Sequence, residues 1–138
     1  MTSRLTPHLH FHGTAREAMG FYAGIFGGDV DFHTFAEIGC GQASEADADR
    51  IAHASLETDA GYAIMACDAP SEHHSAPVTG ASMCLNGDDA ALLRGYFEKL
   101  SAGGTVDMPL AEQAWGDEFG ACVDKFGVPW MVNISRPA

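Results

Sequence analysis

Apolar and polar positions alternate with a period of two over residues 5–12, which is typical of a half-buried β-strand. The period then changes to that of a helix, whose apolar positions are Ala18, Phe21, Tyr22 and Ile25. Thr14 is a candidate N-cap for this helix, and the pair Gly27 and Gly28 gives its stop signal. The pattern therefore predicts a strand followed by a capped helix.

Three more strands are predicted after this helix. Residues 30–35 predict the first of them, and residues 51–58 and 62–67 predict a hairpin around a turn-rich triplet. In between, residues 37–50 combine glycines, small residues and four acidic side chains, which indicates an exposed loop. These elements complete a strand, a helix and three further strands.

The same order of elements begins again after residues 68–80, which contain prolines and no apolar periodicity and are interpreted as a linker. A strand over residues 81–86 precedes a helix that Asp88 or Asp89 can cap. The apolar positions of this helix are Leu92, Leu93, Tyr96, Phe97 and Leu100. Further strands are expected at 105–108, 119–123 and 128–134, with a loop over 109–118.

The last hairpin repeats the earlier one without a gap, because residues 119–133 align with residues 53–67 at a separation of 66 positions. Gly61 falls on Gly127, and Met65 falls on Met131. We therefore predict an α+β fold of two tandem βαβββ modules within one domain spanning residues 1–138. Module one is residues 5–67, the linker is 68–80, and module two is 81–134.

The charge of the chain narrows the classes of partner. The formal net charge is −12, and the isoelectric point is near 4.7. Such a surface repels nucleic acid and anionic membranes, so a small molecule or another protein is the expected partner. No signal peptide is visible, and no stretch approaches the roughly 20 apolar residues that span a bilayer. We expect a soluble, cytoplasmic protein.

The four cysteines, Cys40, Cys67, Cys84 and Cys122, are scattered and form no C-x-x-C pair. Three of them fall within predicted strands. We interpret them as reduced thiols that pack as small hydrophobic side chains.

Four phrases carry a family resemblance: PHLHFHG (7–13), AREAMGFY (15–22), WGDEFG (115–120) and DKFGVPWMVN (124–133). With the two modules, they resemble the PhnB-like branch of the vicinal oxygen chelate superfamily of glyoxalases, bleomycin-resistance proteins and extradiol dioxygenases. Many members of this branch are labelled demethylubiquinone methyltransferases. The resemblance implies a glyoxalase-like fold, with curved mixed sheets around a cavity, and a homodimer.

The resemblance also implies metal ligands on the first and last strand of each module. The ligand glutamates would fall at Met65 and Met131, whose thioethers do not suit hard divalent ions. The first-strand positions would fall at Pro7 and His8 in module one and near Ala81 or Ser82 in module two. At most one ligand of four remains, so we predict that the usual metal site is absent and that no cofactor is bound.

Three histidines, His8, His10 and His12, alternate along the first predicted strand and therefore share one face. Neighbours on one strand face lie roughly 6 to 7 Å apart, so these imidazoles would need bending or a fourth group to hold zinc. Two interpretations stay open. The histidines line a cavity or face solvent, or His8 or His10 holds a divalent metal together with His53.

The aromatic residues near the last hairpin are candidates for ligand contact. Trp115 stands in a polar loop without local apolar partners, so we expect it to cover a cavity mouth or to enter an interface. Phe119 lies where cavity walls are expected. Trp130 lies in a very apolar strand, and we expect it to pack in the core.

A possible S-adenosylmethionine motif, acid-x-Gly-x-Gly, occurs at residues 37–41. Such a turn functions between a buried parallel strand and a helix. The residues that follow, QASEADADR, have no apolar face to pack, which argues against a methyltransferase.

The leading hypothesis is a PhnB-like protein that binds a small organic molecule in a β-sheet cavity without the usual metal. The expected contacts are His8, His10, His53, Met65, Trp115, Phe119 and Met131. One alternative is a metal-dependent lyase, isomerase or dioxygenase that uses the first-strand histidines, and another is a methyltransferase. The residues leave open whether the chain is an enzyme.

Overall fold

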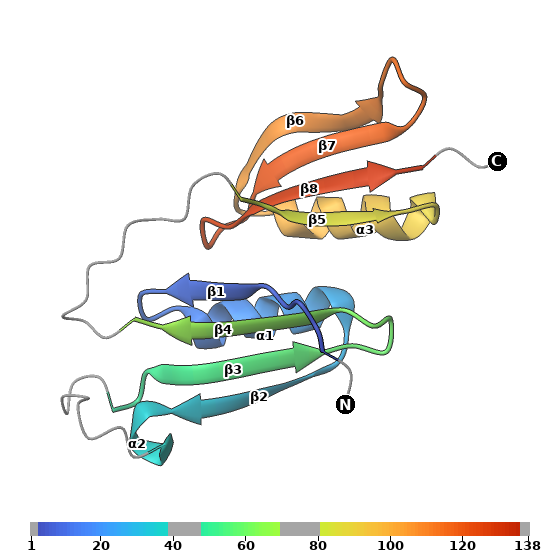
Figure 1. Ribbon diagram of the computed structural model, residues 1–138. Helices are drawn as coiled ribbons and strands as arrows, with labels where there is room; N and C mark the ends of the chain where they lie inside the picture. The colour runs from blue at the N-terminus through green and yellow to red at the C-terminus, as the bar shows by residue number, and fades with distance from the viewer. Residues whose placement is uncertain (1–2, 39–47, 70–80, 136–138) are drawn as a thin grey trace. The chain divides into compact units, whose positions relative to one another are not determined.

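The computed structural model describes residues 3–38, 48–69 and 81–135. The chain divides into two compact units, Met1–Pro77 and Val78–Ala138. Each unit contains a four-stranded sheet and one long helix that lies against one face of that sheet (Figure 1). The predicted α+β architecture of tandem βαβββ modules is confirmed.

The first unit orders its strands β1-β4-β3-β2, and only the β1–β4 pair is parallel. Its elements are β1 (His8–Phe11), α1 (Ala15–Phe26), β2 (Asp29–Thr34), α2 (Phe35–Ile38), β3 (Ile51–Glu57) and β4 (Ala63–Asp68). The short helix α2 occupies the start of the predicted exposed loop, most of which lies outside the described residues.

The second unit repeats this topology with the order β5-β8-β7-β6, in which β5 and β8 are parallel. Its elements are β5 (Met83–Gly87), α3 (Ala90–Ser101), β6 (Thr105–Glu112), β7 (Glu118–Val123) and β8 (Pro129–Ile134).

Each core lies between the long helix and the sheet face that it covers. In the first unit Met19 and Tyr22 of α1 are buried together with Leu56 of β3. In the second unit Leu100 of α3 and Val132 of β8 are buried. Removing such side chains from water provides most of the stabilisation of each unit.

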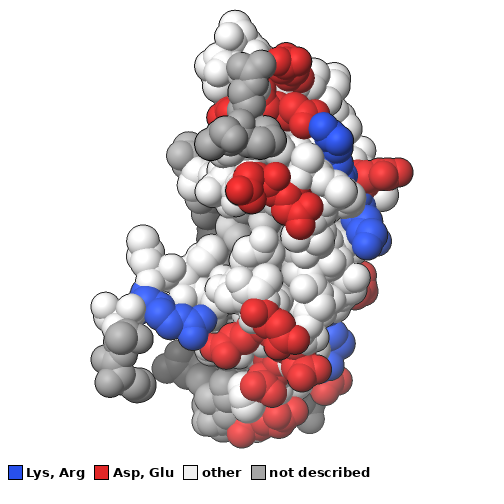
Figure 2. Space-filling view, turned by 90° about the vertical axis from the view of Figure 1, so that its right-hand side faces the viewer, with Lys and Arg blue, Asp and Glu red and all other residues white. Residues whose placement is uncertain are grey.

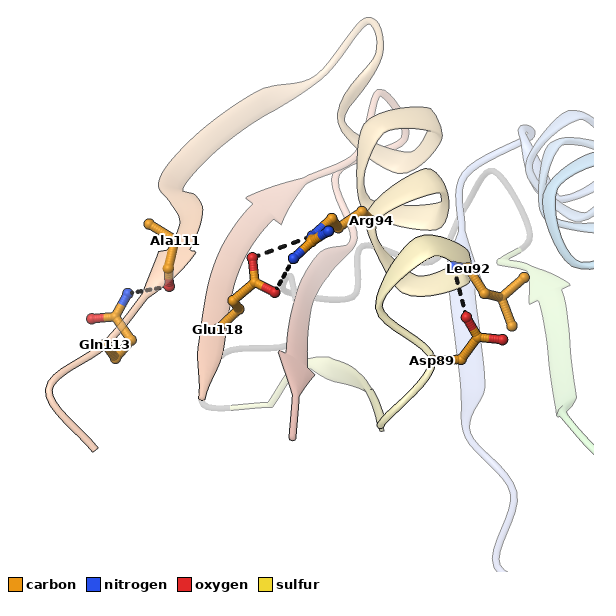
Figure 3. Close-up of polar contacts among 6 residues, drawn as sticks. All are labelled: Asp89, Leu92, Arg94, Ala111, Gln113 and Glu118. Atoms are coloured by element: carbon orange, nitrogen blue, oxygen red, sulfur yellow. Dashed lines mark hydrogen bonds and ion pairs between the residues drawn. The ribbon is translucent and has the colours of Figure 1, made fainter. Parts of the chain in front are cut away.

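One predicted helix position is wrong. Leu92 was placed on the apolar face of the second helix, but its side chain is 42% exposed. It occupies the first turn of α3, where its backbone N–H donates to the Asp89 carboxylate over 3.2 Å (Figure 3). Asp89 is therefore the N-cap residue of α3, and it is one of the two candidates, Asp88 and Asp89, that the sequence predicts.

The first helix is capped differently from the prediction. Thr14 is the N-cap residue, but its side chain makes no capping hydrogen bond. Asp68, at the end of β4, accepts hydrogen bonds from the backbone N–H groups of Gly13, Ala15 and Ile51 at 2.9, 2.9 and 3.0 Å. This buried carboxylate satisfies donors at the start of α1 and of β3, so it joins three segments that are distant in sequence.

Strand β6 is longer than the sequence predicts, because it continues through Pro109 to Glu112 instead of ending at Met108. β6 pairs only with β7, and its register shifts on both sides of Met108. A proline is tolerated on an edge strand, where no neighbour requires its missing N–H. Pro109 therefore predicts the start of a loop at a position where the structure has an edge strand.

The two hairpin turns are built alike. The Thr58 side chain accepts a hydrogen bond from Tyr62 N–H at 3.1 Å, and the Asp124 side chain accepts one from Val128 N–H at 3.1 Å. Gly61 and Gly127 both adopt positive φ, at 91° and 88°. The acceptors and the glycines are each 66 residues apart, so the structure confirms the predicted repeat.

The described part of the chain contains no helix that is long and apolar enough to cross a membrane. Asp and Glu side chains dominate the charge on the face shown in Figure 2, with few Lys or Arg between them.

Candidate functional site

The candidate site lies on the sheet face that the long helix leaves uncovered, and each unit has one such face. Strand register identifies its residues, because side chains alternate between the two faces. In the first unit His8 of β1 pairs with Met65 of β4, and Met65 pairs with Ser55 of β3. In the second unit Cys84 pairs with Met131 of β8, and Met131 pairs with Ala121.

Each open face thus carries a methionine in the same place. Met65 is 36% exposed, while the neighbouring Ile64 and Ala66 are buried toward α1. Met131 is half-buried, and its sulfur accepts a hydrogen bond from the Ser82 hydroxyl at 3.0 Å. The open faces therefore combine apolar surface with a polarisable sulfur atom.

The second open face ends in an aromatic pair. Trp115 lies in the turn between β6 and β7, is 63% exposed, and packs edge-on against Phe119 with ring centroids 6.3 Å apart. The prediction that Trp115 has no local apolar partner is therefore wrong. The turn is held by the hydrogen bond from Gln113 N–H to the Asp117 carbonyl and by the one from the Asn133 amide to the Asp117 carboxylate.

Two polar contacts lie near this turn, and the first of them attaches β7 to α3. The Arg94 guanidinium donates two hydrogen bonds to the Glu118 carboxylate, and the Gln113 side chain donates to the Ala111 carbonyl (Figure 3). Exposed ion pairs contribute little stability, but this two-point contact fixes the orientation of both side chains.

The first open face contains a histidine cluster. The rings of His8 and His10 meet edge-on with centroids 5.0 Å apart, and the His53 ring lies 6.1 Å from that of His8. Cys67 Sγ lies 3.5 Å from His10 Nδ1. His12 lies beyond the end of β1.

The surroundings shift the pKa of two side chains in this cluster, His8 and Cys67. Partial burial, together with the nearby His10 and His53, lowers the pKa of His8, so its neutral imidazole is favoured. Partial burial and the Asp68 carboxylate raise the pKa of the Cys67 thiol. Sequence reasoning identified the three histidines but missed Cys67, whose position depends on the parallel register of β1 and β4.

The donors at the superfamily's usual metal positions do not fit a hard divalent ion. His8 and Met65 meet in the first unit, and Cys84 and Met131 meet at the matching place in the second. The register adds Cys84 as the counterpart of His8, while Ser82, one of the two expected positions, reaches Met131 through its hydroxyl. Two thioethers, a thiol and an imidazole are soft or borderline ligands, whereas magnesium and calcium require oxygen.

Trp130 is buried, as predicted, and its indole N–H donates to the Asp124 carboxylate at 2.8 Å. The three described cysteines are free thiols, but only Cys122 is buried, so the prediction of small packed hydrophobes is wrong for the exposed Cys84. Cys40 lies outside the described residues.

The predicted ligand contacts fall into two groups, one on each unit. His8, His10, His53 and Met65 share the first open face, and Phe119 and Met131 share the second, with Trp115 beside it.

Comparison with known proteins gives the family. A family model described as 3-demethylubiquinone-9 3-methyltransferase matches residues 3–133. Protein YjdN of Escherichia coli (strain K12) is 31% identical over 143 residues, which cover 96% of this chain and 95% of YjdN. The chain belongs to this PhnB-like family. Its fold is the glyoxalase-like fold that the sequence resemblance implied.

Several solved structures share the fold of this chain. Protein PA1353 from Pseudomonas aeruginosa is 33% identical with a TM-score of 0.83, covering 99% of this chain and 100% of that one. A putative 3-demethylubiquinone-9 3-methyltransferase, PhnB protein, from Bacillus cereus is 23% identical with a TM-score of 0.75, covering 96% and 100%. A glyoxylase/bleomycin resistance protein/dioxygenase domain from Frankia sp. EAN1pec shares the fold at 12% identity and a TM-score of 0.67, covering 100% and 95%.

Proposed function

We propose that this PhnB-like protein binds a small organic molecule on the open faces of its two sheets, without the superfamily's usual metal site. The observation that carries the proposal is the matched pair Met65 and Met131. Each thioether occupies the centre of an uncovered sheet face, at the position where the superfamily resemblance places a glutamate ligand.

The side chains around the two methionines support binding of an apolar or aromatic molecule. The first open face adds the imidazoles of His8, His10 and His53, which provide polar contacts without a fixed charge when neutral. The second adds the rings of Phe119 and Trp115. Ligand sites are typically apolar with a few placed polar groups, and this composition matches that description.

The alternative of methyl transfer has less support. Glu37 lies in the short helix α2, directly after β2, and β2 pairs antiparallel with β3 at the edge of its sheet. A nucleotide-binding turn requires a parallel strand at this point. The rest of the candidate motif, residues 39–41, lies outside the described residues. The methyltransferase label of the family model therefore gains no support from this part of the fold.

The proposal is tested with the neutral fluorescent probe N-phenylnaphthylamine, whose emission rises in an apolar site. We expect saturable binding, and we expect Met65→Glu and Met131→Glu each to weaken binding on the face that carries the substitution by roughly tenfold or more, about 1.4 kcal/mol, because the probe would desolvate an unpaired carboxylate. Leu92→Glu is the matched control, since Leu92 is an exposed apolar residue on α3. Absence of saturable binding, or an equal effect of the Leu92 substitution, would contradict the proposal.

A further inference from the structure

Three metal-binding side chains converge on the open face of the first unit. His8 and His10 belong to β1 and Cys67 belongs to β4, and these two strands lie side by side in the sheet (Figure 1). The imidazole nitrogens and the sulfur lie within 4.8 Å of one another. This cluster is a candidate site whose donor set differs from the usual one, because it shares only His8 with the positions at which the superfamily resemblance places metal ligands.

Strand pairing explains why these donors meet. β1 and β4 run parallel, with His8 beside Met65 and His10 beside Cys67. Because alternate residues of a strand share a face, all three donors lie on the side of the sheet away from α1. The carboxylate of Asp68, the next residue along β4, is buried and is occupied by three backbone N–H groups.

The distances suit a tetrahedral ion. Zinc binds nitrogen at about 2.1 Å and sulfur at about 2.3 Å, so an N–Zn–S pair at the tetrahedral angle places its two donors about 3.5 Å apart. Cys67 Sγ and His10 Nδ1 are separated by 3.5 Å. The His8 ring lies 5.0 Å from the His10 ring, and one of its nitrogens is within 4.8 Å of the other two donors.

We infer that His8, His10 and Cys67 form a binding site for a thiophilic transition-metal ion of the zinc class. Two imidazoles and one thiolate suit zinc and exclude magnesium and calcium, which prefer oxygen ligands. Binding replaces the proton of the Cys67 thiol by the metal–sulfur bond, so one proton is released for each ion bound. No electron transfer is involved.

The coordination sphere of this ion has room for a fourth ligand. Three protein ligands with an open position are the pattern of reactive rather than structural zinc sites. His53, with its ring 6.1 Å from that of His8, is a further imidazole beside these donors. This inference stands on the donor geometry and does not depend on whether an organic molecule binds.

The site departs from the superfamily pattern in two respects. Its three donors come from one unit, whereas the resemblance implies ligands from both. It also uses Cys67, two positions beyond Met65 on β4, and His10, two positions beyond His8 on β1. The expectation of no bound metal rests on the first-strand and last-strand positions that the resemblance implies, and Cys67 is not among those positions.

The test uses the full chain, reduced and stripped with a chelator, and titrated with cobalt(II) as a spectroscopic substitute for zinc. We expect one equivalent to produce an intense thiolate-to-cobalt charge-transfer band in the near ultraviolet, which added zinc removes. Cys67→Ser should abolish this band. His8→Ala and His10→Ala should each weaken zinc binding by roughly 100-fold or more. This loss exceeds the usual cost of removing a residue that only hydrogen-bonds to a metal ligand.

His12→Ala and Cys84→Ser are matched controls, an exposed histidine just beyond β1 and an exposed cysteine of the other unit. Both should keep the band and the affinity, and magnesium should not compete. The inference is overturned if no saturable band forms at one equivalent, or if the band persists in Cys67→Ser. It is also overturned if Cys84→Ser removes the band instead. Circular dichroism confirms folding of each variant, and His10→Ala replaces Cys67→Ser as the deciding variant if the latter unfolds.

Discussion

The Cys122 thiol is 1% exposed and lies near two carboxylates, those of Asp124 and Asp107. Burial first, and then these negative charges, raise the pKa of Cys122 from 9.0 to about 11. As pH rises through this window, the unfolded chain loses a thiol proton that the folded chain retains. The free energy of unfolding should therefore fall between pH 9 and pH 11 because of this group.

Urea unfolding of the wild type and of Cys122→Ala over this pH window measures the effect. Between pH 9 and pH 11, the free energy of unfolding should fall less in Cys122→Ala than in the wild type, because the titrating thiol is gone. This expectation holds whatever the stability of the variant at pH 9. Cys84→Ala, which removes an exposed thiol, should keep the wild-type pH dependence. Equal pH dependence in wild type and Cys122→Ala would refute the assignment.

At the scale of single residues, burial was easier to predict than polar partners. Trp130 was placed in the core because its neighbours are apolar, and it is buried there. Its bond to Asp124, and the three backbone bonds of Asp68, were not predicted. Such contacts depend on register and on chain segments far apart in sequence, which local patterns do not encode. Cys67 was missed for the same reason.

A pair of glycines follows each long helix. The second glycine of each pair lies against the end of a strand. A Cβ atom on Gly28 would lie 2.2 Å from the Glu57 carbonyl oxygen, and one on Gly104 would lie 2.1 Å from that of Val123. Glu57 and Val123 are 66 residues apart, like the two hairpins. The glycines therefore permit a close approach of helix end and strand in both units.

Gly104→Ala should lower the free energy of unfolding by about 1–3 kcal/mol, the usual cost of forcing extra atoms into packed structure. Gly95→Ala is its control within α3, because a Cβ there meets nothing within 4 Å. This control should raise stability by about 0.5–1 kcal/mol through the higher helix propensity of alanine. Chemical denaturation measures both, and a neutral or stabilising Gly104→Ala would contradict the close approach.

At the scale of elements, periodicity and turn chemistry predicted the order and type of the main helices and strands. The repeat of 66 residues was visible because each turn needs a glycine with positive φ and the same acceptor position. The errors lie where tertiary context overrides a local signal. Pro109 lies within β6 because an edge strand tolerates it, and Leu92 is exposed because it lies in the first turn of α3.

At the scale of the whole molecule, a homodimer stays a prediction. It rests on the superfamily resemblance and on the large exposed apolar surface of Trp115. Sedimentation equilibrium at micromolar concentration should give twice the mass of one chain. A mass equal to one chain at all concentrations would reject the dimer without affecting the binding proposal.

Family and fold were accessible from sequence because four phrases and an internal repeat extend over most of the chain. The chemistry was less accessible, since one fold supports many activities and only individual side chains decide among them. Met65 and Met131 illustrate both statements, because their spacing marks the repeat, while their thioethers are the basis of the proposal that the usual metal site is absent.

The central claim, that an organic molecule binds on the open sheet faces, is tested most directly by NMR of isotope-labelled methionine methyl groups. With increasing N-phenylnaphthylamine, the Met65 and Met131 signals, assigned by Met→Leu substitution, should shift. The Met19 signal should not, because Met19 belongs to α1 and is fully buried in the core of the first unit. Unmoved Met65 and Met131 signals, or an equal shift of Met19, would contradict the account.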